Sequence, residues 1–77
     1  MQIHVKLYSD LKQYTPGEMG QLDLTLPPGA NLGSVFERLA IPQDRNHIAL
    51  INGRRAFRES VLSQGDTLVV FPQICGG

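Results

Sequence analysis

The sequence predicts an α+β fold, in which a mixed sheet of four or five strands carries one main helix on one of its faces. Three observations lead to this class. Two early segments alternate apolar and polar residues, a later segment repeats its apolar residues with helical spacing, and an apolar run follows near the end. A chain of 77 residues makes one domain, so all these elements must share a single core.

The N-terminal part of the chain is expected to form two strands joined by a loop. Residues 2–8 and 21–26 alternate with period two, which is typical of half-buried strands. Residues 10–20 contain turn-forming residues and are predicted to form the loop, and Pro27-Pro28-Gly29 ends the second strand. The apolar faces consist of Ile3, Val5 and Leu7 in the first strand and Leu22, Leu24 and Leu26 in the second.

A helix is predicted from Leu32 onward, where the apolar period changes. Its apolar stripe consists of Leu32, Val35, Phe36, Leu39 and Ala40. Asn31 is a suitable N-cap, and Pro42 ends the run. Gly33 costs this helix about 1 kcal/mol relative to alanine, so we expect its packing to compensate.

The second half of the chain is predicted to contain three strands, the first two separated by Asn52-Gly53, a strong hairpin signal. In order, we expect a strand at 47–51, a return strand at 54–57, a helical turn at 59–62, a tight turn at 64–66 and a last strand at 67–71. A helix that connects strands of one sheet permits parallel pairing, which we expect for the first and last strands. This order is that of a β-grasp domain, here residues 1–72, followed by a flexible tail, residues 73–77.

The composition argues against several classes of function. Seven basic and seven acidic residues give a net charge of zero, whereas nucleic-acid binding normally requires a basic excess for phosphate contacts. No apolar stretch approaches the length of about 20 residues that a membrane span needs, and the N-terminus lacks the apolar run of a signal peptide. We therefore expect a soluble, cytoplasmic protein that binds neither nucleic acid nor membrane.

The C-terminal stretch carries a more specific pattern. A Gly65-Asp66 turn leads into an apolar strand that ends in Phe71-Pro72, and the sequence closes on Gly76-Gly77. This pattern resembles the MoaD/ThiS-like sulfur-carrier family, which includes the small subunit of molybdopterin synthase and the thiamin sulfur carrier. The family's Pro-Gly turn before the helix (Pro28-Gly29) and its Asn-Gly hairpin (Asn52-Gly53) also occur in order. The resemblance covers the whole chain and implies a ubiquitin-like β-grasp fold.

The resemblance implies a carrier protein rather than an enzyme. A ubiquitin-activating-type enzyme (MoeB/ThiF-like) would use ATP to adenylate the Gly77 carboxylate, and a sulfur donor would convert it to a thiocarboxylate. A large synthase subunit (MoaE-like), or another sulfur acceptor, would then use that sulfur. No bound cofactor or metal is implied. Gly76 and Gly77 suit this role because residues without side chains can pass through a narrow tunnel to a partner's active site.

Strand parity predicts where partners dock. If Leu68 and Val70 face the core, the second face of the sheet is left open, and an exposed apolar patch there favours binding. The family is known to dock through this face, and the third strand must contribute Leu50 or Ile51, with the turn spacing favouring Leu50. The candidate partner-binding residues are Tyr8, Leu50, Val69, Phe71, Pro72 and Ile74. The alternative is that some of them pack under the loop at 10–20.

Other reactive or charged residues are given structural or surface roles. Cys75 occupies a position where the family has a small unreactive residue, and we interpret it as a bystander thiol because nothing cationic is near it in sequence. His4 and His47 are expected at the surface and share no metal-ligand spacing. Arginines at 54, 55 and 58 are interpreted as a solvated turn rather than a surface that steers an acidic partner.

Four functions remain open at this point. Phe71-Pro72 and the long loop at 10–20 favour a sulfur carrier for molybdopterin or tungstopterin synthesis. A carrier for thiamin or another sulfur pathway is the nearest alternative. A ubiquitin-like modifier that forms amide links to lysines is a third, and a β-grasp binding module whose tail has no role is a fourth.

Overall fold

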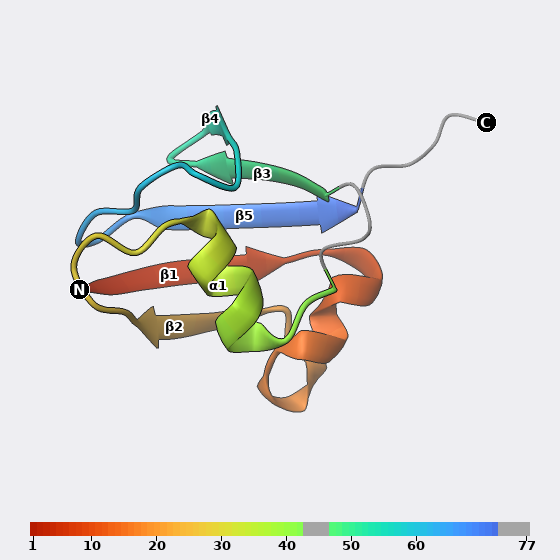
Figure 1. Cartoon of the computed structure of the whole chain (residues 1–77). Coiled ribbons are helices and arrows are strands. Elements are labelled where there is room, and N and C mark those ends of the chain that lie inside the picture. Colours follow the sequence, from red (N-terminus) through yellow and green to blue (C-terminus); the bar gives the residue numbers. More distant parts are fainter. Residues whose placement is uncertain (43–46, 73–77) are drawn as a thin grey trace.

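The computed structural model describes residues 1–42 and 47–72 and shows one five-stranded mixed sheet with one α-helix (Figure 1). The elements are β1 (Gln2–Leu7), β2 (Gln21–Thr25), α1 (Leu32–Leu39), β3 (His47–Ile51), β4 (Arg54–Ala56) and β5 (Thr67–Pro72). The sheet order is β2-β1-β5-β3-β4, and β1 and β5 pair in parallel while all other neighbours are antiparallel. The predicted α+β class and the parallel pairing of first and last strands are therefore confirmed.

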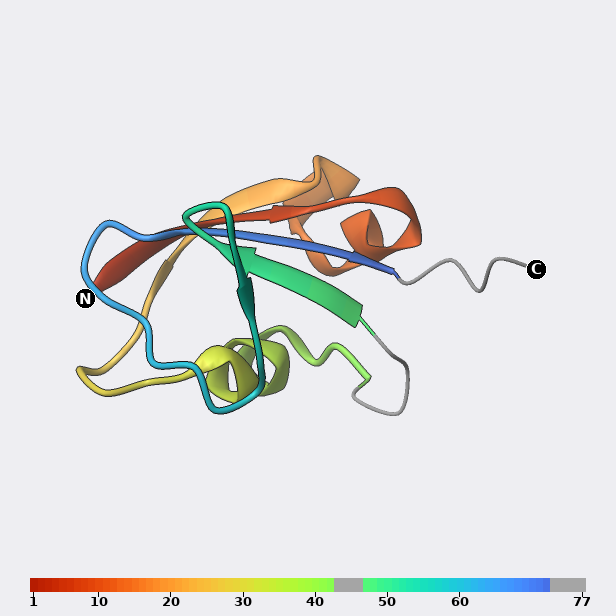
Figure 2. The same cartoon turned by 90° about the horizontal axis from the view of Figure 1, so that it is seen from above.

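The core lies between the sheet and α1, which covers one face of the sheet only (Figure 2). The largest fully buried side chains come from β1, α1 and β5: Ile3, Val5, Leu7, Val35, Leu68 and Val70. These are the residues that the alternating and helical patterns predict to be inside. In the part of the chain that the structure describes, no helix has the length and hydrophobicity of a membrane span.

Both ends of α1 are fixed by local hydrogen bonds. The Asn31 side chain accepts from the Ser34 backbone N–H at 3.0 Å, and the Ser34 hydroxyl accepts from the Asn31 N–H at 3.3 Å, which completes a capping box. At the other end Ala40 adopts a left-handed conformation with φ 58° and is exposed. The prediction that Ala40 continues the apolar stripe is wrong. The left-handed residue turns the chain so that Ile41 is buried instead, and its N–H donates to the Phe36 carbonyl at 2.9 Å.

The segment expected to be a plain loop at 10–20 contains two 3₁₀ helices, η1 (Ser9–Tyr14) and η2 (Pro16–Glu18). Leu11 of η1 is buried in the core, at the end of the sheet where β1 finishes. Thr15 holds the segment together, because its hydroxyl donates to the Lys12 carbonyl at 2.6 Å and accepts from the Gly20 N–H at 2.8 Å.

The connection between β4 and β5 packs against the N-terminus of α1. The N–H groups of Leu32 and Gly33 donate to the carbonyls of Ser60 and Arg58, both at 3.0 Å. A β-carbon added at Gly33 would lie 3.0 Å from Cγ of Arg58, so glycine allows this close approach. That packing compensates for the poor helix propensity of glycine, as expected from the sequence.

Several predicted boundaries shift. The helical turn expected at 59–62 is wrong: a turn at 58–59 is followed by extended chain, where Val61 forms an isolated bridge with Asn31. β1, β2 and β4 each end one residue earlier than predicted. Pro72 belongs to β5, where it pairs with His47, so the last strand is one residue longer than predicted.

The Asn52-Gly53 hairpin is tied to the Gly65-Asp66 turn. Asn52 and Gly53 both have positive φ, 53° and 83°, as a type I′ turn requires. The Asn52 side chain donates to Oδ1 of Asp66 at 2.8 Å and accepts from the Thr67 N–H at 2.9 Å. The other Asp66 oxygen accepts from the Ser63 N–H at 2.8 Å. Two turns far apart in sequence thus fix the beginning of β5 against the end of β3.

Candidate functional site

We call the face of the sheet opposite α1 the outer face. Leu68 and Val70 of β5 are completely buried on the α1 side, so Val69 and Phe71 point to the outer face, where they are half-buried. None of the described segments crosses this face in the view along the sheet (Figure 2). The parity predicted for β5 therefore places two candidate residues on an open surface.

The register between β3 and β5 extends this apolar surface. Leu50 lies opposite Val69, whereas its neighbours Ala49 and Ile51 lie opposite the core residues of β5. Leu50 therefore lies on the outer face, as the turn spacing predicts. Ile48, which pairs with Phe71, lies there too and was missed, although the same alternation along β3 could have found it.

Tyr8 borders this surface near the end of β5. Tyr8 follows β1 in an extended conformation, its N–H donates to the Val70 carbonyl at 3.1 Å, and its side chain is 47% exposed. The segment at 10–20 lies beside Tyr8, where Lys12 and Met19 line a hollow with it, but leaves it largely exposed. Pro72, the last residue of β5, is half-buried at the same end of the sheet.

The remaining predicted site residues, Ile74, Gly76 and Gly77, lie outside the described residues, as does Cys75. Chain geometry still limits their reach. Five residues follow Pro72, and a fully extended chain of that length spans at most about 17 Å. Any chemistry at Gly77 therefore takes place within about 17 Å of the end of β5.

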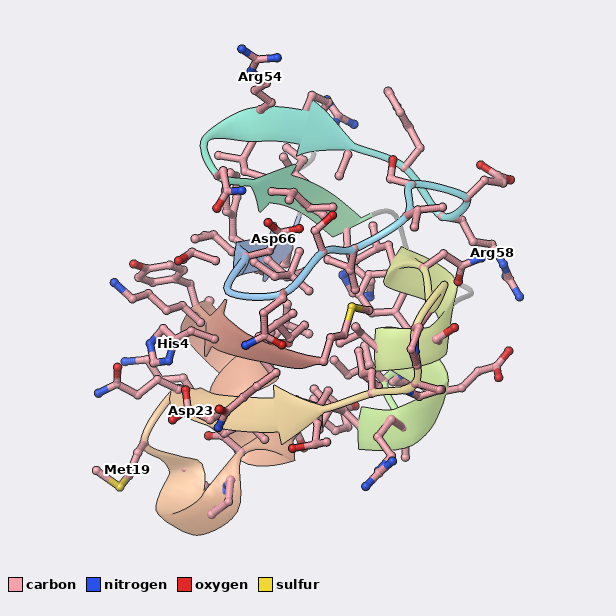
Figure 3. The ribbon with its side chains drawn as sticks, turned by 90° about the vertical axis from the view of Figure 1, so that its left-hand side faces the viewer. His4, Met19, Asp23, Arg54, Arg58 and Asp66 are labelled. Atoms are coloured by element: carbon pink, nitrogen blue, oxygen red, sulfur yellow. The ribbon has the colours of Figure 1, made fainter. Side chains whose placement is uncertain are left out.

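The two histidines differ in their surroundings. His4 lies on the outer face and its Nδ1 is 2.7 Å from Oδ1 of Asp23, both side chains projecting away from α1 (Figure 3). His47 is half-buried at the surface rather than fully exposed. Its ring packs edge-on against Phe36 at 5.7 Å between centroids, Nε2 bonds the Pro42 carbonyl at 3.1 Å, and Nδ1 is buried. Among residues 1–42 and 47–72, no three His, Cys, Asp or Glu side chains are grouped to hold a metal.

Comparison with known proteins identifies a family and several similar folds. Residues 5–77 match the ThiS family. A search of curated proteins gives no match.

Solved structures that resemble this one include several small archaeal proteins. The small archaeal modifier protein 1 of Haloferax volcanii superposes with a TM-score of 0.78 at 20% identity, over 95% of this chain and 98% of its own. A protein described as subunit 1 of the molybdopterin converting factor of Pyrococcus furiosus gives 0.77 at 20% identity, over 96% and 99%. The ubiquitin of Caldiarchaeum subterraneum gives 0.62 at 21%, over 100% and 98%. At these identities the likeness shows the fold, which is that of ubiquitin-like β-grasp proteins.

The family match covers nearly the whole chain, and the fold agrees with it. The chain belongs to the ThiS family, has a ubiquitin-like β-grasp fold and is not an enzyme.

Proposed function

We propose that this protein is a sulfur carrier whose Gly77 carboxylate is adenylated by an ATP-dependent enzyme of the ubiquitin-activating type and then converted to a thiocarboxylate. The sulfur is delivered to a large synthase subunit that builds molybdopterin or tungstopterin. The observation that carries the proposal is the ThiS family match, because it runs through to Gly77 and includes the terminal Gly76-Gly77.

The chemistry explains why a partner must do the activation. A carboxylate is a poor electrophile, and joining it to AMP, with release of pyrophosphate, makes an acyl group that a sulfur nucleophile can attack as AMP departs. Among the described residues the outer face offers apolar and charged side chains for docking, and we assign it no catalytic group. The carrier supplies the acyl group and a surface that places it.

The geometry also limits how the activating enzyme is built. Its ATP site must lie within about 17 Å of the place where β5 ends, since the tail reaches no farther. Tyr8, Phe71 and Pro72 surround that place on the carrier. If the enzyme covers the outer face, the end of β5, after which the tail begins, lies at the edge of the interface.

Intact mass spectrometry tests the proposal directly. The full chain, incubated with the adenylating enzyme of its own organism, ATP and a persulfide donor with thiol reductant, is expected to gain the mass of one oxygen replaced by one sulfur. Deleting Gly76 and Gly77 is the control and should abolish the change. An unmodified wild-type chain, in a reaction where the enzyme consumes ATP with another carrier, would refute the carrier role.

Two alternatives are separated by experiments in cells. A ubiquitin-like modifier shares the adenylation step, and the solved modifier proteins have the same fold. In cells it would appear as conjugates in which Gly77 is amide-linked to lysines of other proteins. A thiamin carrier would restore thiamin synthesis, and not molybdenum-enzyme activity, in a strain lacking its own small carrier.

A further inference from the structure

Four side chains on the outer face lie in one row across the sheet. The strand register pairs Lys6 of β1 with Val69 of β5, Val69 with Leu50 of β3, and Leu50 with Arg55 of β4. Neighbouring strands are about 4.8 Å apart, so the backbones of Lys6 and Arg55 lie about 14 Å apart on the two sides of an apolar centre. The row therefore reads cation, apolar, apolar, cation.

Neither cation is neutralised by a carboxylate of the described residues. Over residues 1–42 and 47–72, no carboxylate lies within ion-pair distance of Lys6 or Arg55. Asp23, the acidic residue of β2 on this face, is bonded to His4 at 2.7 Å, outside the row (Figure 3). The positive charge on both sides of Val69 and Leu50 is thus available to a partner.

Arg55 is also held in place by an aromatic ring. Its guanidinium carbon lies 5.3 Å from the centroid of Phe57, whose side chain is 60% exposed. A guanidinium over an aromatic face is stabilised by the ring quadrupole, which limits the freedom that Arg55 loses on binding. Exposed arginine and aromatic residues next to each other are typical of the residues that contribute most to interfaces.

We propose that the outer face recognises an acidic surface of the adenylating enzyme, with Lys6 and Arg55 each facing a carboxylate and Val69 and Leu50 filling an apolar site between them. This inference rests on the proposed function and adds the chemistry of the partner. Charges at the sides of an interface accelerate encounter and fix its orientation more than they add affinity.

The chain contains matched controls for this proposal. Arg54 precedes Arg55 on β4 but pairs with Ile51, and its side chain points away from the domain at the edge of the sheet (Figure 3). Arg58 lies beside α1, where its guanidinium is 3.9 Å from Glu37. The arginines that look like one cluster in sequence are therefore divided, and only Arg55 belongs to the row.

Stopped-flow association of the full chain with its adenylating enzyme tests the proposal. At low ionic strength, Lys6→Glu and Arg55→Glu should each lower the association rate about tenfold, whereas Arg54→Glu and Arg58→Glu should change it less than about twofold. Near 1 M salt, where the screening length is about 3 Å, the difference should largely vanish. Arg55→Lys keeps the charge and should stay within about threefold of wild type. Urea unfolding of each variant verifies that it is folded.

The outcomes distinguish this inference from the function it depends on. If the wild type is adenylated but Arg55→Glu and Arg54→Glu associate equally fast, the acidic-partner inference is overturned and the carrier function stands. If the wild type is not adenylated by an enzyme shown to be active, the proposed function fails and the inference falls with it.

Discussion

The tie between the two turns gives a quantitative prediction. Replacing Asn52 by glycine keeps the positive φ of the type I′ turn but removes both side-chain hydrogen bonds, one to Asp66 and one from the Thr67 N–H. The first involves a charged group and the second a neutral pair, with typical net contributions of about 1.5–3 and 0.5–1.5 kcal/mol. Both lie at exposed positions, which favours the lower ends of these ranges, so we expect a loss of about 2 kcal/mol.

Urea unfolding of the Asn52→Gly variant measures this loss. With a slope near 1 kcal/mol per M, as expected for a small domain, the midpoint should fall by about 2 M. Asn52→Asp is expected to be at least as damaging, because its carboxylate would face that of Asp66 across a hydrogen-bond distance.

An exchange of the two side chains provides the decisive control. In the double variant Asn52→Asp with Asp66→Asn, a carboxylate again accepts from the Thr67 N–H and from an amide at position 66, while the amide oxygen can accept from the Ser63 N–H. Net charge is unchanged, and most of the lost stability should return. If the double variant is no more stable than Asn52→Asp alone, or if Asn52→Gly leaves the midpoint unchanged, the reasoning is refuted.

Three further comparisons test the fold and its faces, each by urea unfolding of paired variants. Leu68→Ala should lower the free energy of unfolding by about 2–5 kcal/mol because Leu68 is completely buried. Val69→Ala should lower it by less than about 1 kcal/mol and, measured separately, weaken binding to the adenylating enzyme. Equal losses of stability would contradict the assignment of faces. Gly33→Ala should raise the free energy of unfolding by about 1 kcal/mol in an Arg58→Ala background. In the wild type the gain should be clearly smaller, because the added methyl group meets the Arg58 side chain. Identical gains in the two backgrounds would show that this contact does not matter. Asn31→Ala should lower the free energy of unfolding by about 1 kcal/mol through loss of the capping box, whereas Asn31→Asp should retain most of this stabilisation.

The faces of the strands could be predicted from the sequence because period-two alternation alone determines which side chains share a side. Val69 and Leu50 were placed correctly by this argument. Alternation does not say which strands are neighbours, so the row from Lys6 to Arg55 became visible only when the register placed β5 between β1 and β3. Arg55 and Arg54 are adjacent and identical in sequence, and only their pairing partners separate them.

The segments that were predicted poorly share a physical cause. A 3₁₀ turn has too few residues for an apolar period, so neither Leu11 nor Thr15 signals the burial found in η1 and after it. Ala40 fits the helical stripe by spacing, but burial of Ile41 competes with it and the chain turns left-handed at Ala40. In both segments the burial of one residue in the core, Leu11 or Ile41, decides the local conformation of the chain.

The short tail makes the docking register matter for the chemistry. A shift of two residues along a strand moves a bound partner by about 7 Å, which is about two-fifths of the roughly 17 Å that the tail can span. An apolar patch by itself tolerates such a shift, because Phe71 and Ile48 form a second apolar pair one step along from Val69 and Leu50. Charges resist it, since moving by one step would leave Lys6 and Arg55 without their carboxylates. In the proposed complex the two cations therefore set where along β5 the enzyme sits, and so whether the Gly77 carboxylate meets ATP.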